Sequence, residues 1–167
     1  WIKYAASLPK SFFNLASGPE IDIQGNGQTI ADGDVTPDLS DHTDFGDVAV
    51  SNGYVERTFT IYNNGTSDLT LSGSPIVTLT GSGDFSLITD ATSPVTSGGN
   101  TTFVIRFDPS SEATVSGNIS IVNNDSDENP YDFDIEGTGT ASVDWCNLQW
   151  PASGTIRGGN DYNVYAQ

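Results

Sequence analysis

The sequence predicts an all-β protein with the fold of an immunoglobulin-like, two-sheet antiparallel β-sandwich. Short runs of alternating apolar and polar residues recur between residues 19 and 141. Clusters of Gly, Asn, Asp, Ser and Pro separate these runs, and no stretch has the periodicity of a helix. Seven or eight short strands in about 120 residues are typical of a sandwich of two sheets.

The first strand that alternation identifies covers residues 55–61. Its apolar residues occupy alternate positions and share one face, and the charged Arg57 falls on that same face. Asn63-Asn64-Gly65 follows directly and supplies residues that adopt positive φ in a tight turn. We therefore expect the strand to end at this turn.

Shorter alternating runs follow at residues 69–71, 76–79 and 85–87. Residues 101–107 form the clearest strand, with Thr102, Val104 and Arg106 on its outward face. This strand ends before Pro109, since Pro lacks the amide hydrogen that a central strand donates. Its inward residues are expected to be Phe103, Ile105 and Phe107.

The last two strands are predicted at residues 119–121 and 131–135. In the second, apolar residues alternate with acidic ones, which gives the strand an apolar face and an acidic face. The inward residues of all the alternating segments form the predicted core: Ile21, Ile23, Phe45, Phe59, Ile61, Leu69, Leu71, Phe85, Phe103, Ile105, Phe107, Ile119, Ile121, Phe133 and Ile135.

The chain divides into three parts. Residues 1–18 are expected to be an N-terminal extension or the end of a preceding module, and residues 19–141 form the β-patterned domain. Residues 142–167 are expected to begin a following β module or to form a C-terminal extension. The chain begins at Trp1 and not at Met, so we expect that a leader was lost or that the chain is part of a longer protein.

The charge composition limits the kinds of partner that the protein is expected to bind. The 167 residues carry 22 acidic and 5 basic side chains, for a net charge of −17. Nucleic acid and anionic membranes are disfavoured, because both are bound through Lys and Arg. No stretch reaches the roughly 18 apolar residues of a membrane span. Strong acidity suits a soluble, self-repelling extracellular protein, or one that lives with salt and divalent cations; the alternative is a merely solvated acidic surface.

Catalytic equipment is absent from the sequence pattern, so we predict that the protein is not an enzyme. A Ser-His-Asp triad or a multi-histidine zinc site would have to use His42, the single histidine, which lies in a polar loop. No nucleophile elbow or phosphate-binding loop occurs. A glycosidase pair such as Asp44 with Glu56 would need a substrate cleft, yet all three Trp residues lie outside the β-patterned domain.

Two acidic clusters are candidate calcium ligands, because calcium takes about six to eight oxygen ligands. The candidate residues are Asp32, Asp34, Asp125 and Asp127. The alternative is that these residues make solvated turns, since Asp and Asn are turn formers. No other cofactor is predicted. Cys146 is the single cysteine, so it is expected to be buried in a small apolar site, or to pair with another chain or with a segment outside this sequence.

An ordered set of motifs gives the domain a family resemblance. The motifs are Pro-Glu-Ile-Asp-Ile-Gln-Gly-Asn-Gly (19–27), Ile-Ala-Asp-Gly-Asp-Val-Thr-Pro (30–37), Thr-Asp-Phe-Gly (43–46), Thr-Phe-Thr-Ile-Tyr-Asn-Asn-Gly (58–65), Phe-Asp-Pro-Ser (107–110), Asn-Asn-Asp-Ser-Asp-Glu-Asn-Pro-Tyr (123–131) and Glu-Gly-Thr-Gly (136–139). The domain resembles the bacterial choice-of-anchor D domain, which is similar to the immunoglobulin-like ASPM/SPD-2/Hydin group. The resemblance implies a non-enzymatic module of a large secreted or surface protein.

Two functions follow as expectations, and a third, the binding of an unidentified carbohydrate or protein ligand through loops at one end of the sandwich, stays open without an aromatic platform to favour it. The first is a structural or adhesive module, a spacer or stalk, whose partners are neighbouring modules of the same protein. The second is a self-assembling extracellular filament subunit, in which a terminal segment adds a strand to an identical subunit. The second rests on residues 1–18, which hold apolar side chains that need burial outside a sandwich that already looks complete.

Overall fold

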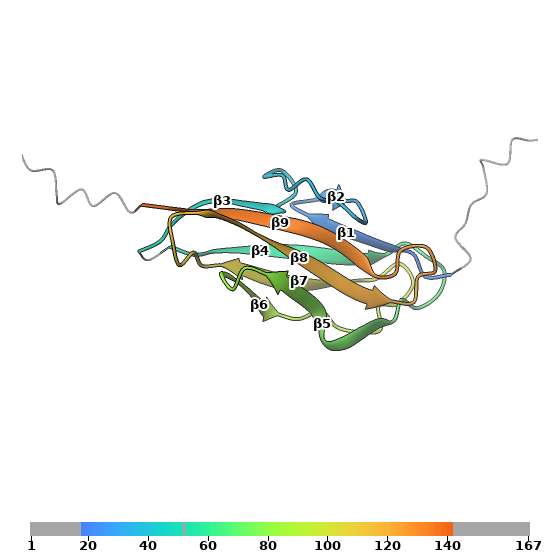
Figure 1. Ribbon diagram of the computed structural model, residues 1–167. Helices are drawn as coiled ribbons and strands as arrows, with labels where there is room; N and C mark the ends of the chain where they lie inside the picture. Colours follow the sequence, from blue (N-terminus) through green and yellow to red (C-terminus); the bar gives the residue numbers. More distant parts are fainter. Residues whose placement is uncertain (1–17, 52, 142–167) are drawn as a thin grey trace, which may run out of the picture.

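The computed structural model of the protein describes residues 18–51 and 53–141. The predictions for residues 1–17, for residues 142–167 and for Cys146 lie outside these ranges. Within them the chain forms strands and no helix (Figure 1), so no helix there could cross a membrane. The strands are β1 (Ile21–Gly25), β2 (Gln28–Ile30), β3 (Asp44–Ala49), β4 (Val55–Asn63), β5 (Leu71–Gly81), β6 (Phe85–Thr89), β7 (Asn100–Phe107), β8 (Thr114–Asn123) and β9 (Tyr131–Thr140).

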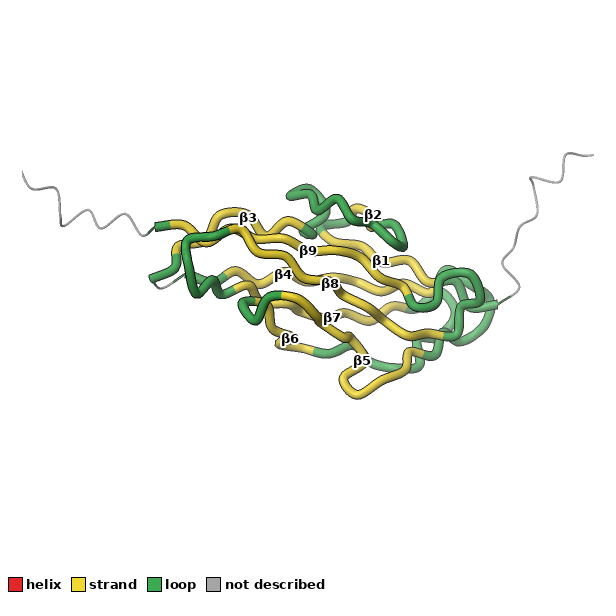
Figure 2. The backbone as a smooth tube through the Cα atoms, in the orientation of Figure 1, coloured by secondary structure: helices red, strands yellow, loops and turns green. Residues whose placement is uncertain are grey.

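The strands form two stacked sheets (Figure 2), and the predicted immunoglobulin-like β-sandwich is confirmed. The five-stranded sheet has the order β2-β1-β4-β7-β6, and the four-stranded sheet has the order β3-β9-β8-β5. One pairing departs from the antiparallel prediction, because β3 runs parallel to β9. Alternation along a strand carries no information about the direction of its neighbour, so the sequence pattern could not reveal this pairing.

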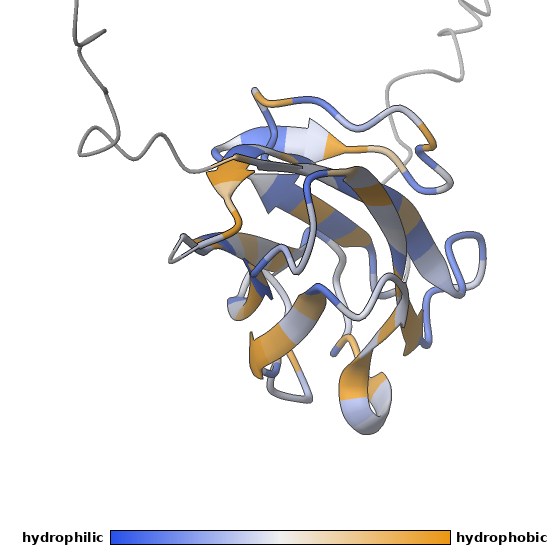
Figure 3. Ribbon diagram, turned by 60° about the vertical axis from the view of Figure 1, so that its left-hand side comes forward, coloured by the Kyte–Doolittle hydropathy of each residue, from blue (hydrophilic) through white to orange (hydrophobic). Residues whose placement is uncertain are grey.

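All fifteen predicted core residues are buried between the sheets. The alternation of apolar and polar residues along the strands is visible in Figure 3. Phenylalanines from both sheets meet in the centre: the ring centroids of Phe45 and Phe85 lie 5.3 Å apart, and those of Phe59 and Phe133 lie 5.7 Å apart. Such pairs stabilise a core by about 0.5–1.5 kcal/mol each beyond the burial of their area.

The two strands predicted at residues 69–71 and 76–79 are not separate, because most of their residues belong to the single strand β5. Leu71 begins β5, which continues through the second segment with an irregular register between Ser72 and Val77. Leu69 lies outside the strand and forms an isolated bridge with Val95. Pro75 interrupts the alternation within β5, and for that reason the sequence pattern shows two runs.

The two ends of the described domain lie at opposite ends of the sandwich (Figure 1). We call the end that holds Gly18 the entry pole and the end that holds Ala141 the exit pole. At the entry pole the amide of Thr66 donates to the carbonyl of Gly18, at 2.8 Å. At the exit pole the amide of Val50 donates to the carbonyl of Thr140, at 3.0 Å. Backbone hydrogen bonds therefore hold the chain where it enters and leaves the fold.

A charge on the inward face of β7 should prevent folding. Ile105 is fully buried, and an unpaired carboxylate there would cost several kcal/mol in a domain whose total stability is about 5–15 kcal/mol. We expect Ile105→Asp to lack the β-sheet circular dichroism spectrum and the cooperative melting of the wild type. Val122→Asp is the matched control, because Val122 also lies in a strand but is 49% exposed. A wild-type spectrum and melting curve for Ile105→Asp would contradict the inward assignment.

Candidate functional site

The acidic loop between β2 and β3 folds through its own carboxylates. Asp34 accepts hydrogen bonds from the amide and hydroxyl of Thr36, at 2.9 and 2.6 Å. Asp41 repeats this arrangement with the amide and hydroxyl of Thr43, at 2.9 and 2.6 Å. A carboxylate that accepts from the residue two positions further along the chain forms a local turn. The alternative to calcium binding predicted this role for the acidic residues.

The four candidate calcium ligands do not converge on one metal site. Asp32 accepts from the amide of Asp132 at 2.9 Å, and the buried Asp125 accepts from the amide of Ile21 at 3.0 Å. Asp34 accepts from Thr36 within its own turn, and Asp127 is exposed. Among the described residues no group of three or more His, Cys, Asp or Glu side chains is placed to hold a metal ion. A structural calcium therefore stays a prediction from the sequence.

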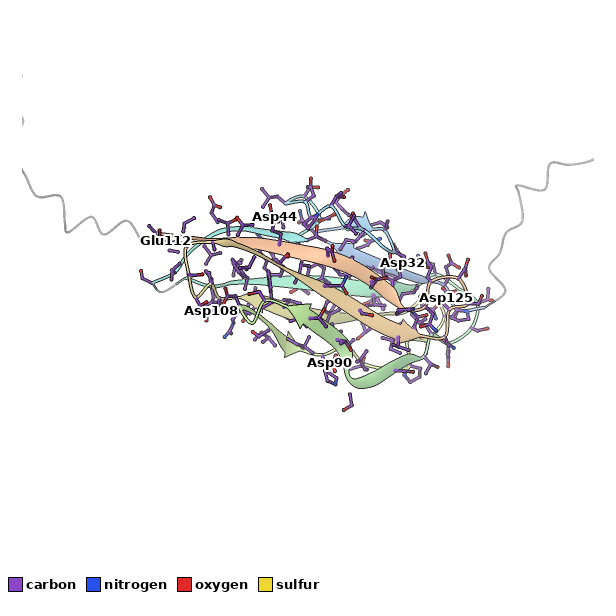
Figure 4. The ribbon with its side chains drawn as sticks, viewed as in Figure 1. Asp32, Asp44, Asp90, Asp108, Glu112 and Asp125 are labelled. Carbon is purple, nitrogen blue, oxygen red and sulfur yellow. The ribbon has the colours of Figure 1, made fainter. Side chains whose placement is uncertain are left out.

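Carboxylates nevertheless gather at the entry pole, where Figure 4 shows Asp32 and Asp125 on the same side of the molecule. Glu128 lies among them, and its pKa is raised to about 7. Burial is the main cause, and the negative charges of Asp125, Glu20, Asp32 and Asp127 add to it in that order. This electrostatic cluster joins residues from three separate loops or strands, so sequence spacing alone could not identify it.

Asn63 organises the same pole and is fully buried. Its side-chain nitrogen donates to the carbonyls of Ser67 and Val95, at 2.8 and 2.9 Å. Its side-chain oxygen accepts from the amides of Glu20 and Gly65, at 3.3 and 3.1 Å. One side chain thus links the entering segment, the turn after β4 and the loop before β7. The sequence pattern places Asn63 only in the turn, because Glu20 and Val95 lie far from it along the chain.

The residues considered for catalysis are not brought together. Asp44 lies in the four-stranded sheet and accepts from the amide of Gly46, at 2.8 Å. Glu56 lies in the five-stranded sheet and forms a salt bridge with Arg106, at 2.6 Å. His42 has its pKa lowered, chiefly by burial and next by the charge of Arg57. Neither carboxylate shares a substrate site with the other in this arrangement.

The two long edges of the sandwich differ. At one edge, which we call the closed edge, Gly33 donates to Asp132 at 2.7 Å and Asp134 donates to Asp34 at 2.8 Å, so the chain after β2 is bonded to β9. The hydroxyl of Tyr131 also donates to the carbonyl of Ile30 across the two sheets. At the opposite edge, which we call the open edge, β5 and β6 terminate the two sheets without pairing to each other, although side chains of Asp90 and Ser93, from the chain after β6, bond to the amides of β5.

Charge is unevenly spread over the two outer faces. On β9 the outward residues Asp132, Asp134 and Glu136 form an acidic row, and Asp44 of β3 lies beside Glu136 in the parallel register. The outer face of the five-stranded sheet carries Arg106 instead, which pairs with Glu56. The predicted acidic face of residues 131–135 is therefore confirmed, and it belongs to the four-stranded sheet.

Comparison with known proteins adds a likeness of fold. No family model matches the sequence, and no curated protein matches it. The resemblance to the choice-of-anchor D domain accordingly stays a prediction. Among solved structures, the ASH / PapD-like domain of human CEP192 (PapD-like domain 7) has a TM-score of 0.48 and 11% identity, over 85% of this chain and 99% of that one.

Two bacterial structures are similar at comparable levels. The secreted serine protease VesC from Vibrio cholerae has a TM-score of 0.45 and 14% identity, over 57% of this chain and 21% of that chain. This chain thus matches about a fifth of the protease. A FixG-related protein from Vibrio parahaemolyticus has a TM-score of 0.40 and 11% identity, over 72% and 95% of the two chains. These likenesses concern the fold and say nothing about activity.

Removing the charge of Glu128 should stabilise the protein above neutral pH. The folded-state pKa of about 7 exceeds the ordinary value of 4.5, so ionisation costs folding free energy between about pH 4.5 and 7, and the cost persists above that. We expect Glu128→Gln to raise the free energy of unfolding, relative to the wild type, at pH 8 and to leave it nearly unchanged at pH 4.5. Urea unfolding at both pH values measures the difference.

Glu112→Gln is the matched control, because Glu112 is an exposed residue that Figure 4 shows at the exit pole. The lowered pKa of His42 changes the free energy of unfolding with the opposite pH dependence. Neutral His42 favours the folded state, and this stabilisation is lost as the pH falls below about 6.5. All three proteins keep His42, so this contribution cancels in the comparison. A Glu128→Gln effect of the same size at both pH values would contradict the raised pKa.

Proposed function

We propose that this chain is a non-catalytic structural module that works as a spacer or stalk within a secreted or cell-surface bacterial protein. The observation that carries the proposal is the position of the two ends, because Gly18 and Ala141 lie at opposite poles of the sandwich (Figure 1). A module of this kind extends a chain when it is joined in line with others. The choice-of-anchor D motifs in the sequence support the secreted or surface location and an adhesive role in the parent protein.

The strands that meet the two ends are suited to bearing tension along the long axis. The entering segment leads into β1, which is paired with β4 from Ile21 to Gly25. The leaving segment continues β9, which lies between β8 and β3. Tension between the poles acts along these strands, so their hydrogen bonds are loaded in shear and must break together. Forced unfolding depends on the rate of unfolding, and shear loading slows that rate.

Single-molecule pulling tests this proposal. Handles at Gly18→Cys and Ala141→Cys load β1 and β9 in shear, whereas handles at Gly18→Cys and Asn64→Cys peel β1 from β4 one bond at a time. Cys146→Ser removes the native thiol in both variants, and a Cβ at Gly18 meets no atom within 4 Å. We expect a clearly higher unfolding force for the first pair. Equal forces in the two directions would argue against a tension-bearing module.

The second proposed function is assembly into extracellular filaments. Its specific support is the open edge, which stands beside a core that is complete without residues 1–17. Sizing by light scattering at several protein concentrations separates the two functions. Assembly that grows with concentration, and is lost when residues 1–18 are deleted, supports the filament subunit. A monomer at every concentration, unchanged by the deletion, supports the spacer alone.

A further inference from the structure

Three of the four edge strands are bonded or covered along or beside part of their length. The chain after β2 is bonded to β9 through Gly33 and Asp34. The loop before β3 covers its beginning, where the amide of Asp44 donates to Asp38 at 3.1 Å, and β3 is itself bulged. Bonding to a neighbour prevents an edge from accepting another strand, whereas a register irregularity occurs in both β3 and β6 and does not distinguish these two edges.

The edge of β5 is protected by side chains. The carboxylate of Asp90 accepts from the amides of Ile76 and Val77, at 2.8 and 3.0 Å. The hydroxyl of Ser93 accepts from the amide of Leu71, at 2.9 Å. Together with Pro75, which has no amide hydrogen, these contacts occupy the first half of the β5 edge.

The edge of β6 is the least protected of the four against pairing with another strand. Its sequence from Phe85 to Thr89 holds no charged residue, as is also true of β2 and β5, but it lacks the proline and the bonded side chains of the β5 edge. The amide of Asp108 donates to the carbonyl of Asp84, so the pair of Phe85 with Phe107 is one of the non-hydrogen-bonded pairs of the ladder.

That register fixes the direction of the next backbone groups. Ser86 is the hydrogen-bonded partner of Arg106, and Leu87 is again a non-hydrogen-bonded position. The N–H and C=O of Leu87 therefore point away from β7 and toward the open edge. They form a backbone donor and acceptor pair to which an added strand could bond.

Apolar side chains accompany this backbone edge. Ile76, Leu79 and Leu87 pack against the core but are only partly buried. Ile88 is 43% exposed, at the irregular register of β6. An added strand would therefore gain apolar burial as well as backbone hydrogen bonds. Figure 3 shows the apolar colouring of the strands at this lower edge of the sandwich.

The N-terminal segment has the chemistry that fits this edge. Residues 1–17 contain two of the chain's five basic residues, Lys3 and Lys10, and no acidic residue. They also contain the apolar run around Phe12 and Phe13. Asp84 and Asp90 flank β6 at its two ends, so a basic, apolar strand is complementary to the edge in both charge and hydropathy.

Geometry favours a neighbouring copy as the donor. β6 pairs with the part of β7 that lies opposite Val55–Thr58. These residues form the half of β4 nearer the exit pole. Gly18 lies beside the other end of β4, about 20–30 Å away along the strand. In a head-to-tail row, the exit pole of one copy adjoins the entry pole of the next, so the next copy's N-terminal segment begins close to this β6.

We propose that the open edge of β6 receives residues 1–17 of a neighbouring copy of this chain as an added strand. This inference rests on the second proposed function and names the receiving surface for it. A contact between two different surfaces is heterologous, and repetition of such a contact produces an open filament.

Ile88→Lys in the full chain tests the receiving edge. A lysine on an edge strand opposes pairing and repels the basic donor, and the partly exposed position should tolerate it. Val122→Lys is the matched control, because Val122 is 49% exposed but lies on β8, away from any edge. By sedimentation at rising concentration we expect the wild type and Val122→Lys to assemble and Ile88→Lys to assemble at least about tenfold more weakly. Thermal melting confirms that each variant is folded.

Equal assembly of Ile88→Lys and Val122→Lys would overturn the inference, while the filament function would stand. A wild type that stays monomeric at every concentration would overturn both and leave the spacer function. Cross-linking gives an independent readout in the Cys146→Ser background: copies with Phe13→Cys, mixed with copies with Ile88→Cys, should form disulfide-linked heterodimers. Heterodimers equally abundant when Val122→Cys replaces Ile88→Cys, or absent from both mixtures, would also overturn the inference.

Discussion

The packing of phenylalanines between the two sheets is the interaction on which the rest of the structure depends. Phe45 of the four-stranded sheet contacts Phe85 and Phe107 of the five-stranded sheet, with centroid distances of 5.3 and 6.1 Å. The chain is 167 residues long, and within 18–51 and 53–141 no disulfide or metal cluster supports the fold. Its stability must therefore come from apolar burial and from hydrogen bonds that leave few buried groups unpaired.

Acidic side chains are used in two distinct ways around that core. In the loops, carboxylates such as Asp34, Asp41 and Asp90 accept backbone amides, so they replace the strand partners that those amides lack. On β9 and around Glu128 they instead lie close to one another and repel. The first use stabilises turns and closes an edge. The second keeps one face and one pole strongly negative, which opposes association there.

The contrast between the edges links the fold to its proposed roles. The closed edge ties β2 and β9 together, and the poles place the two ends of the domain in line, as a spacer requires. At the open edge neither β5 nor β6 holds a charged residue, and β6 lies beside partly buried apolar side chains. Both roles use the same rigid sandwich, and they differ only in whether the neighbour is joined covalently or through an added strand.

The sequence by itself determined the sandwich and its core, because alternation at a period of two states which side chains face inward. It predicted each of the fifteen core residues, the turn at Asn63 and the half-buried Arg57 on the inward face of β4. These features are local, so neighbouring residues suffice to identify them.

The tertiary structure alone decided which segments meet. The parallel pairing of β3 with β9, the cluster around Glu128 and the hydrogen bonds of Asn63 with Glu20 and Val95 all join residues far apart in the sequence. It also decided that β6 ends a sheet, since alternation is the same in an edge strand and in a central one. Those long-range placements create the surfaces on which function depends.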